Sequence, residues 1–204
     1  MKYYCYECAR RLDERTPSVT LPVALEIIHH PSEKPSKSTA VHAVVLSPQA
    51  RMHESPEVPE YDPETSVLLF PSATAVDIVD YPKLATLQRV IVIDSQWQKT
   101  NGIIAHPNLA KLPCVVISKR STYFWRYQPK DMGDDFLATI EAIYYFYRDY
   151  LTAMNPGKPY DGSVDNLLYF FAHMYKVIQN AYKEKGKDMN RISNFVEKDD
   201  GEEK

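Results

Sequence analysis

Glycine is scarce in this chain: only 6 glycines occur among 204 residues, and the first of them is Gly102. The phosphate-binding loops of P-loop proteins and of Rossmann dinucleotide-binding domains depend on closely spaced glycines. The first hundred residues therefore contain neither kind of loop. If this part of the protein binds a nucleotide-like molecule, it does so on another scaffold.

Cysteines and long hydrophobic segments are also few. The longest apolar runs, such as residues 41–46, are far too short to span a bilayer, so no membrane partner is expected. The amino terminus lacks the apolar core of a secretory signal. Three cysteines without such a signal favour an intracellular location, nuclear or cytoplasmic and not secreted, over a disulfide framework.

The remaining composition is that of one globular domain, with 44% hydrophobic and 25% charged residues. Short apolar or β-branched runs predict strands at 23–28, 41–46, 66–70, 90–93 and 114–117. Apolar spacing predicts helices at 95–104, 136–151 and 163–183. This alternation is typical of an α/β layer with a mainly parallel sheet. The proline-rich span 48–63 is expected to be a loop and the charged tail 184–204 to be mobile.

The most informative stretch is residues 90–97, Val-Ile-Val-Ile-Asp-Ser-Gln-Trp. Its four β-branched residues fit a strand that is buried on both faces. Open α/β sheets bind ligands just beyond the carboxyl ends of their strands, which is where Asp94, Ser95 and Trp97 follow. Two interpretations remain open, because Asp94 or Ser95 could equally cap the next helix and the indole could pack in a core.

Two further segments carry weaker signals. Residues 119–130 combine aromatic residues with four cations and no acid, although the net charge of the chain is −3. That mixture suits nucleobase stacking and phosphate contact, and it equally suits an aromatic-covered loop. The helix start at 136–142 could hold an anionic group at its backbone N–H groups, or Thr139 and Glu141 could simply cap the helix.

Cys5 and Cys8 have the two-residue gap of a zinc chelate. Tetrahedral zinc needs four ligands, and Cys114 lies in a predicted core strand, where a cysteine is usually an inert buried thiol. The pair is therefore a possible half-site for zinc, and two reduced thiols are the favoured interpretation.

Taken together, these segments resemble the DTW-domain family of tRNA-uridine aminocarboxypropyltransferases. The family is named for an Asp-x-Thr-Trp motif, which corresponds here to residues 94–97. The resemblance continues through KSTAVHA at 37–43, LLFPS at 68–72, FWRYQ at 124–128, FLATIEAIYYFY at 136–147 and DNLLYFFAHMY at 165–175. Two departures stand out: Gln96 replaces the usual Thr, and the sequence lacks the second, upstream Cys-x-x-Cys that members commonly carry, so no zinc knuckle is carried over.

The resemblance implies a SPOUT-like α/β fold with a mainly parallel sheet, flanking helices and a knot. It divides the chain into a Cys-x-x-Cys segment at 1–20, a single catalytic domain at 21–183 and the tail. It also implies that S-adenosylmethionine donates its 3-amino-3-carboxypropyl group to N3 of a uridine in the tRNA D-loop. A SPOUT-type RNA methyltransferase and a non-catalytic tRNA- or RNP-binding protein are the alternatives.

The same resemblance assigns site residues. Asp94, Trp97 and Ser95 would be catalytic, with Asp94 either accepting the N3 proton or orienting the donor. The donor would be held by Leu69, Phe70, Pro71, Asp94, Leu137, Ala138, Thr139, Glu141 and Ala142. The tRNA would be bound by Lys37, Lys119, Arg120, Trp125, Arg126 and Lys130.

Overall fold

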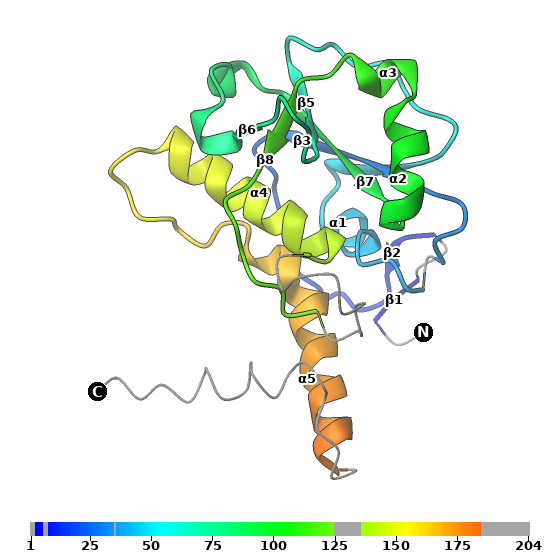
Figure 1. Cartoon of the computed structure of the whole chain (residues 1–204). Helices are drawn as coiled ribbons and strands as arrows, with labels where there is room; N and C mark the ends of the chain where they lie inside the picture. Colours follow the sequence, from blue (N-terminus) through cyan, green and yellow to red (C-terminus); the bar gives the residue numbers. More distant parts are fainter. Residues whose placement is uncertain (1–2, 6–7, 35, 125–135, 185–204) are drawn as a thin grey trace.

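A parallel β-sheet forms the centre of the molecule (Figure 1). The computed structural model describes residues 3–5, 8–34, 36–124 and 136–184. The six strands are β3 (Ala24–His29), β4 (Ala50–Glu54), β5 (Ser66–Leu69), β6 (Val76–Asp77), β7 (Arg89–Asp94) and β8 (Cys114–Val116). They lie in the order β4-β3-β7-β5-β8-β6, and each neighbouring pair is parallel. The α/β class and the mainly parallel sheet are confirmed.

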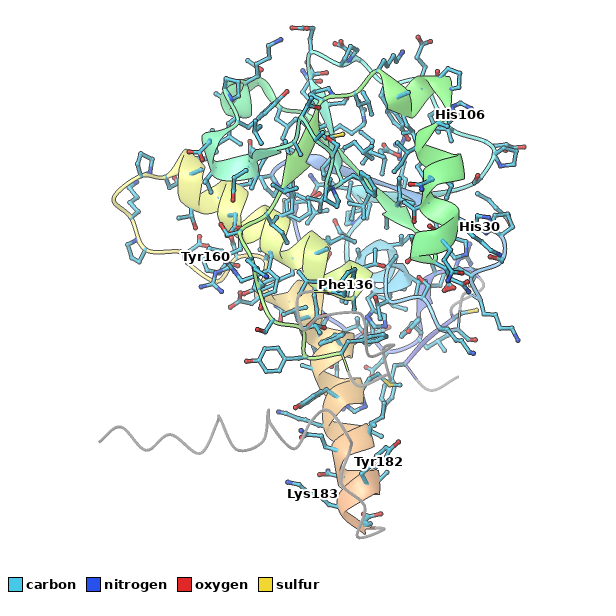
Figure 2. All side chains as sticks on the ribbon, in the orientation of Figure 1. His30, His106, Phe136, Tyr160, Tyr182 and Lys183 are labelled. Atoms are coloured by element: carbon cyan, nitrogen blue, oxygen red, sulfur yellow. The ribbon has the colours of Figure 1, made fainter. Side chains whose placement is uncertain are left out.

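Helices cover both faces of the sheet (Figure 1). They are α1 (Val41–Leu46), α2 (Trp97–Ile104), α3 (Pro107–Ala110), α4 (Thr139–Met154) and α5 (Tyr169–Glu184). Short 3-10 turns occur at η1 (Ile78–Asp80), η2 (Leu84–Thr86) and η3 (Asp165–Leu168), and β1 (Tyr4–Cys5) pairs with β2 (Arg10–Arg11) in a separate hairpin. No helix in the described part of the chain is long and apolar enough to cross a membrane. Helix α5 extends away from the sheet, with Tyr182 and Lys183 near its far end (Figure 2).

The sheet has a hydrophobic core on each face, and β7 shows how its sequence fills both. Val90 and Val92 belong to the cluster shared with α1, α4 and α5, whereas Ile91 belongs to the cluster shared with α2 and α3. Successive side chains of a strand point to opposite faces, so a strand between two helical layers must be apolar at consecutive positions. The uninterrupted apolar run of β7 therefore fits a strand in the middle of the sheet, between β3 and β5. The carboxyl end of β7 lies there too.

The strand predicted at 41–46 is wrong, because these residues form helix α1. Three valines favour a strand by intrinsic propensity, but propensity is a weak term that tertiary burial overrides. All six residues except Val44 are buried, so the short helix has no polar face from which a helical period could be read.

The loop predicted at 48–63 is partly wrong, because it contains the edge strand β4 at 50–54. Polar residues at 51, 53 and 54 and the surrounding prolines obscure the strand pattern. The three predicted helices are confirmed with shifted boundaries, as α2, α4 and η3 followed by α5. Of the predicted tail, Glu184 ends α5, and the rest lies outside the described residues.

Candidate active site

The carboxylate of Asp94 lies at the carboxyl end of β7 and is 4% exposed. Its Oδ2 accepts a hydrogen bond from Ser38 Oγ at 2.7 Å and lies 2.8 Å from His29 Nδ1. Its Oδ1 accepts a hydrogen bond from Thr139 Oγ1 at 2.8 Å. The parallel register of β3 and β7 pairs His29 with Asp94 and so brings these two side chains together. Ser38 comes from the segment before α1, and Thr139 is the first residue of α4. One buried carboxylate thus joins three separate elements.

The contacts of His29 favour its imidazolium form. Its Nδ1 faces the Asp94 carboxylate, and its Nε2 lies 3.0 Å from the backbone carbonyl oxygen of Glu33. Both partners are acceptors only, so each ring nitrogen must carry a hydrogen. The hydrogen bond to Asp94 raises the pKa of His29 above its ordinary value, although burial acts in the opposite direction. The site therefore contains a buried ion pair.

The charged state of His29 predicts a pH dependence of stability. Because the folded-state pKa of His29 is raised, its protonation stabilises the fold fully below the ordinary pKa, and that contribution is lost as pH rises through the raised pKa. We expect the difference in unfolding free energy between the wild type and His29→Gln to shrink as pH rises, measured by urea denaturation between about pH 5.5 and 8.5. Titrating groups that do not interact with His29 are shared by both proteins and cancel. Parallel curves would show that folding does not raise the pKa of His29.

Asp94 does not cap the helix that follows it, so the capping interpretation is wrong. Helix α2 begins at Trp97, and its N-cap position is Gln96, which makes no side-chain cap. Asp94 instead uses its carboxylate on His29, Ser38 and Thr139, as described above. Ser95 Oγ lies 2.8 Å from Thr100 Oγ1 in α2. Trp97 opens α2, and the position of its indole lies outside what the structure describes.

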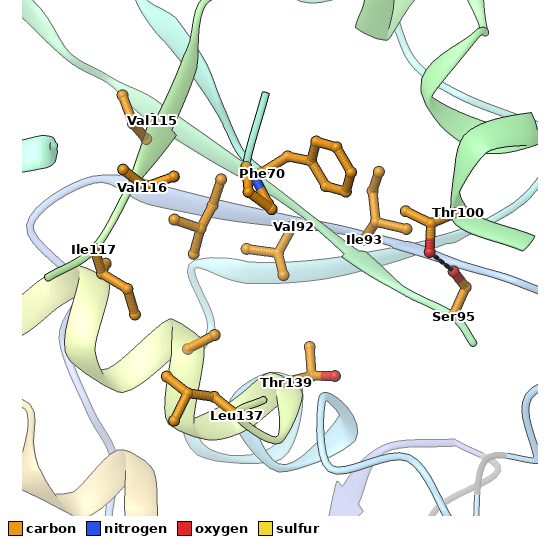
Figure 3. Close-up of a pocket in the computed structure, with 13 residues that line it drawn as sticks. Phe70, Val92, Ile93, Ser95, Thr100, Val115, Val116, Ile117, Leu137 and Thr139 are labelled. Atoms are coloured by element: carbon orange, nitrogen blue, oxygen red, sulfur yellow. Dashed lines mark hydrogen bonds between the residues drawn. The ribbon is translucent and has the colours of Figure 1, made fainter. Parts of the chain in front are cut away.

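A cavity of about 280 Å³ opens beside Asp94 at the carboxyl edge of the sheet, and we call it the Phe70 cavity (Figure 3). Side chains of β7 and β8 and the start of α4 form its mainly apolar walls, and the hydroxyls of Ser95, Thr100 and Thr139 add polar groups. Six of the residues predicted to hold a donor line it: Leu69, Phe70, Pro71, Leu137, Thr139 and Ala142. Thr139 connects the cavity to Asp94 through its hydrogen bond.

Glu141 is one predicted donor-binding residue that is used differently. Its carboxylate, on a residue 2% exposed, accepts hydrogen bonds from Thr122 Oγ1 at 2.6 Å, from the Tyr123 backbone N–H at 2.7 Å and from the Ala138 backbone N–H at 2.7 Å. Burial raises the pKa of Glu141, while these three bonds act to lower it. Neither Glu141 nor Ala138 is among the residues that line the Phe70 cavity. Glu141 fastens the segment after β8 to the first turn of α4.

Three of the six predicted RNA-binding residues lie in the described part of the structure. Lys37 and Lys119 are exposed. Arg120 donates to Asp149 Oδ1 at 3.0 Å, and its guanidinium carbon lies 5.4 Å from the centre of the Tyr145 ring. The remaining three, Trp125, Arg126 and Lys130, lie outside the described residues.

Cys5 ends β1, and Cys8 lies exposed in the turn between β1 and β2. Within the described ranges, no group of three or more His, Cys, Asp or Glu side chains is placed to hold a metal ion. The pair alone would provide only two of the four ligands that structural zinc requires.

The sequence predictions missed two partners of Asp94, namely His29 and Ser38. The position of His29 could have been inferred from the sequence. It directly follows the strand predicted at 23–28, as Asp94 follows the one at 90–93, so both residues fall at the same edge of the sheet. Ser38 lies within the KSTAVHA segment, but nothing local indicates that its hydroxyl turns back toward β7.

Known proteins resemble this chain over most of its length. The chain is 37% identical to the Mus musculus protein named tRNA-uridine aminocarboxypropyltransferase 1, over 88% of this chain and 74% of that protein. The corresponding values are 35%, 91% and 79% for the Xenopus laevis protein of the same name and 33%, 94% and 78% for the human one.

A solved structure of the SAM-dependent rRNA:acp-transferase Tsr3 from Vulcanisaeta distributa aligns with a TM-score of 0.44 at 16% identity, over 85% of this chain and 98% of that one. That likeness is too low to carry an argument about the site. The family model described as the DTW domain matches residues 2–179. With this match and the identities above, the chain belongs to the DTW-domain family.

Proposed function

We propose that this protein transfers the 3-amino-3-carboxypropyl group of S-adenosylmethionine to N3 of a uridine in tRNA, in the D-loop. The observation that carries the proposal is the Phe70 cavity beside the buried Asp94–His29 ion pair, built from the motifs of a family whose similar proteins are named for this reaction. The name of the relatives supplies the substrate class. The cavity supplies a place for the donor.

The Phe70 cavity has the chemistry that a sulfonium donor with an adenosine group needs. Its apolar walls, which include Phe70 and Leu137, suit an adenine ring, and the hydroxyls of Ser95 and Thr139 suit the polar ribose or amino-acid groups. Asp94 places a negative charge next to this cavity, where it attracts the donor's sulfonium and ammonium groups. When bound, the donor supplies an electrophilic carbon attached to sulfur.

The hydrogen bonds of Asp94 favour positioning over proton transfer. Its two oxygens already accept from His29, Ser38 and Thr139, and each such bond stabilises the charged form that a base would have to give up. Asp94 therefore orients Thr139 and the donor in our proposal. Productive orientation matters because a displacement of about 1 Å can cost about 100-fold in rate.

The other predicted roles are retained as parts of this proposal. Ser95 would contact the donor from the wall of the Phe70 cavity, and Trp97 would form a wall for the sulfonium or the acceptor base. Lys37 and Lys119, both exposed, would contact RNA phosphate. A SPOUT-like, knotted chain path is part of the same proposal, and a crystal structure with an unknotted trace would overturn it.

The product of the reaction provides the direct test. Unmodified tRNA incubated with the protein and S-adenosylmethionine is expected to yield 3-(3-amino-3-carboxypropyl)uridine, detected by mass spectrometry of the released nucleosides. A mass gain of one methyl group would instead identify an RNA methyltransferase. Binding of tRNA without any modified nucleoside, together with no heat of binding for S-adenosylmethionine, would identify a non-catalytic RNA-binding protein.

A further inference from the structure

A second cavity, of about 420 Å³, lies beside the Asp94 ion pair, and we call it the His29 cavity. His29 and Ser38, two of the partners of Asp94, line it, whereas the third partner, Thr139, lines the Phe70 cavity. The two oxygens of one carboxylate are thus bonded to the walls of two different cavities. A group transfer between two molecules requires two binding sites that meet at the reacting atoms.

The walls of the His29 cavity combine apolar groups with carboxylates. Val44 of α1 and Met52 of β4 provide apolar surface, and Glu33 and Glu54 provide two acids. The side-chain carboxylate of neither residue has a hydrogen-bond or ion-pair partner among the residues that the structure describes, and Glu54 interacts electrostatically with His29. An unused acceptor beside an apolar wall is suited to a flat ring with an N–H group at its edge.

We propose that the His29 cavity receives the uracil ring of the acceptor nucleotide, an inference that rests on the proposed function. The imide N3–H of uracil donates a hydrogen bond, which Glu33 or Glu54 accepts. Val44 and Met52 contact the face of the ring. A uridine in a folded tRNA must leave its stack to enter such a cavity, as in other enzymes that modify bases.

The charges around this cavity fit the chemistry of the acceptor. A carboxylate removes the N3 proton, the N3–carbon bond forms while the carbon–sulfur bond of the donor breaks, and methylthioadenosine leaves with the electron pair. The proton then passes from the carboxylate to water. Negative charge develops on the uracil ring as N3 loses its proton, and the fixed imidazolium of His29 in the cavity wall stabilises it.

Lysines on the loop that forms one wall of the cavity fit the phosphates of an entering nucleotide. Lys34 and Lys37 are exposed on this loop, which Figure 2 marks at His30. Lys99 of α2 donates to Ser32 Oγ at 2.7 Å, so a third cation reaches the same loop. Phosphate contacts position a nucleic acid, whereas the contacts inside the cavity distinguish the base.

Filling each cavity separately tests the assignment. Val44→Phe reduces the His29 cavity and is expected to lower kcat/KM for tRNA about 10-fold or more while leaving the dissociation constant of S-adenosylmethionine within about twofold. Ala142→Phe, the matched change in the Phe70 cavity, is expected to weaken S-adenosylmethionine binding about 10-fold or more. Equal tRNA kinetics for Val44→Phe and the wild type would overturn the inference. Wild-type protein that forms no product would remove the proposed function and this inference together.

The carboxylates provide a second, less disruptive test. The double variant Glu33→Gln/Glu54→Gln is expected to lose about 100-fold in kcat, the effect of removing a proton acceptor, with unchanged S-adenosylmethionine affinity. Glu57→Gln, an exposed neighbour outside the cavity, is the control and should retain wild-type kinetics. A double variant as active as the control would overturn the inference. If Val44→Phe no longer binds S-adenosylmethionine, its kinetics do not report on the His29 cavity, and the result for the double variant is then the deciding one.

Discussion

Asp94→Ala is expected to reduce product formation about 100-fold or more and to destabilise the fold by about 3–5 kcal/mol. The activity falls because Thr139, His29 and the donor lose the group that orients them, and misplacement alone costs about 100-fold. The stability falls because one partner of a buried ion pair is removed while the other stays buried. Nucleoside mass spectrometry and urea denaturation at pH 6 measure the two effects.

Two further variants separate the charge of Asp94 from the contribution of one of its hydrogen bonds. Asp94→Asn keeps the volume but removes the charge, and it should reproduce most of the loss of activity. Ser38→Ala leaves the ion pair but removes two hydrogen bonds, one to Asp94 Oδ2 and one accepted from the backbone N–H of Ala40. The bond to the charged carboxylate is expected to account for about 1.5–3 kcal/mol of the cost. Wild-type-level product from Asp94→Asn would contradict a role for its charge.

Glu141→Ala is expected to lower the free energy of unfolding by about 2–6 kcal/mol. It leaves the hydroxyl of Thr122 and the backbone N–H of Ala138 buried without their acceptor, and each such group costs about 1–3 kcal/mol. The first turn of α4 also loses its tie to the segment after β8, which displaces Leu137 and Thr139 in the Phe70 cavity. Denaturant titration and calorimetry with S-adenosylmethionine should therefore show losses of both stability and donor affinity.

The two effects of Glu141→Ala identify what this carboxylate does. The family resemblance alone predicts a direct contact with the donor, in which case affinity would fall without a change in stability. The structure predicts that both fall together, and that Glu141→Gln, which keeps one acceptor oxygen, restores part of each. Loss of donor affinity at wild-type stability would contradict the positioning role.

The sequence was sufficient to predict the centre of the fold and one side of the site. The apolar run of β7 and its abrupt polar end predicted both a central strand and the location of Asp94, since a buried parallel strand needs apolar side chains on both faces. The helical period of 163–183 was visible because this segment, which forms η3 and α5, is long enough for several turns. Such features depend on neighbours in sequence.

The features that were missed depend on distant contacts. Helix α1 is six residues long and almost wholly buried, so neither period nor propensity distinguishes it from a strand. The sequence does not reveal which groups the Glu141 carboxylate binds, because a carboxylate at the start of a helix can either cap the helix or contact a ligand. Its bond to Thr122 becomes evident only when the structure places the two residues side by side. His29 and Ser38 reach Asp94 only through the arrangement of the sheet.

The separation in sequence between Asp94 and its partners has a consequence for folding. They lie 65, 56 and 45 residues away, for His29, Ser38 and Thr139 respectively. Three long loops must close before the carboxylate is fully bonded, so the complete site exists only when all these elements are folded together. A fragment lacking β3 or α4 cannot assemble it. A small molecule that recognises the completed site therefore binds the native state alone and shifts the unfolding equilibrium toward that state. Once the site is saturated, the free energy of unfolding rises with the logarithm of the concentration of the molecule.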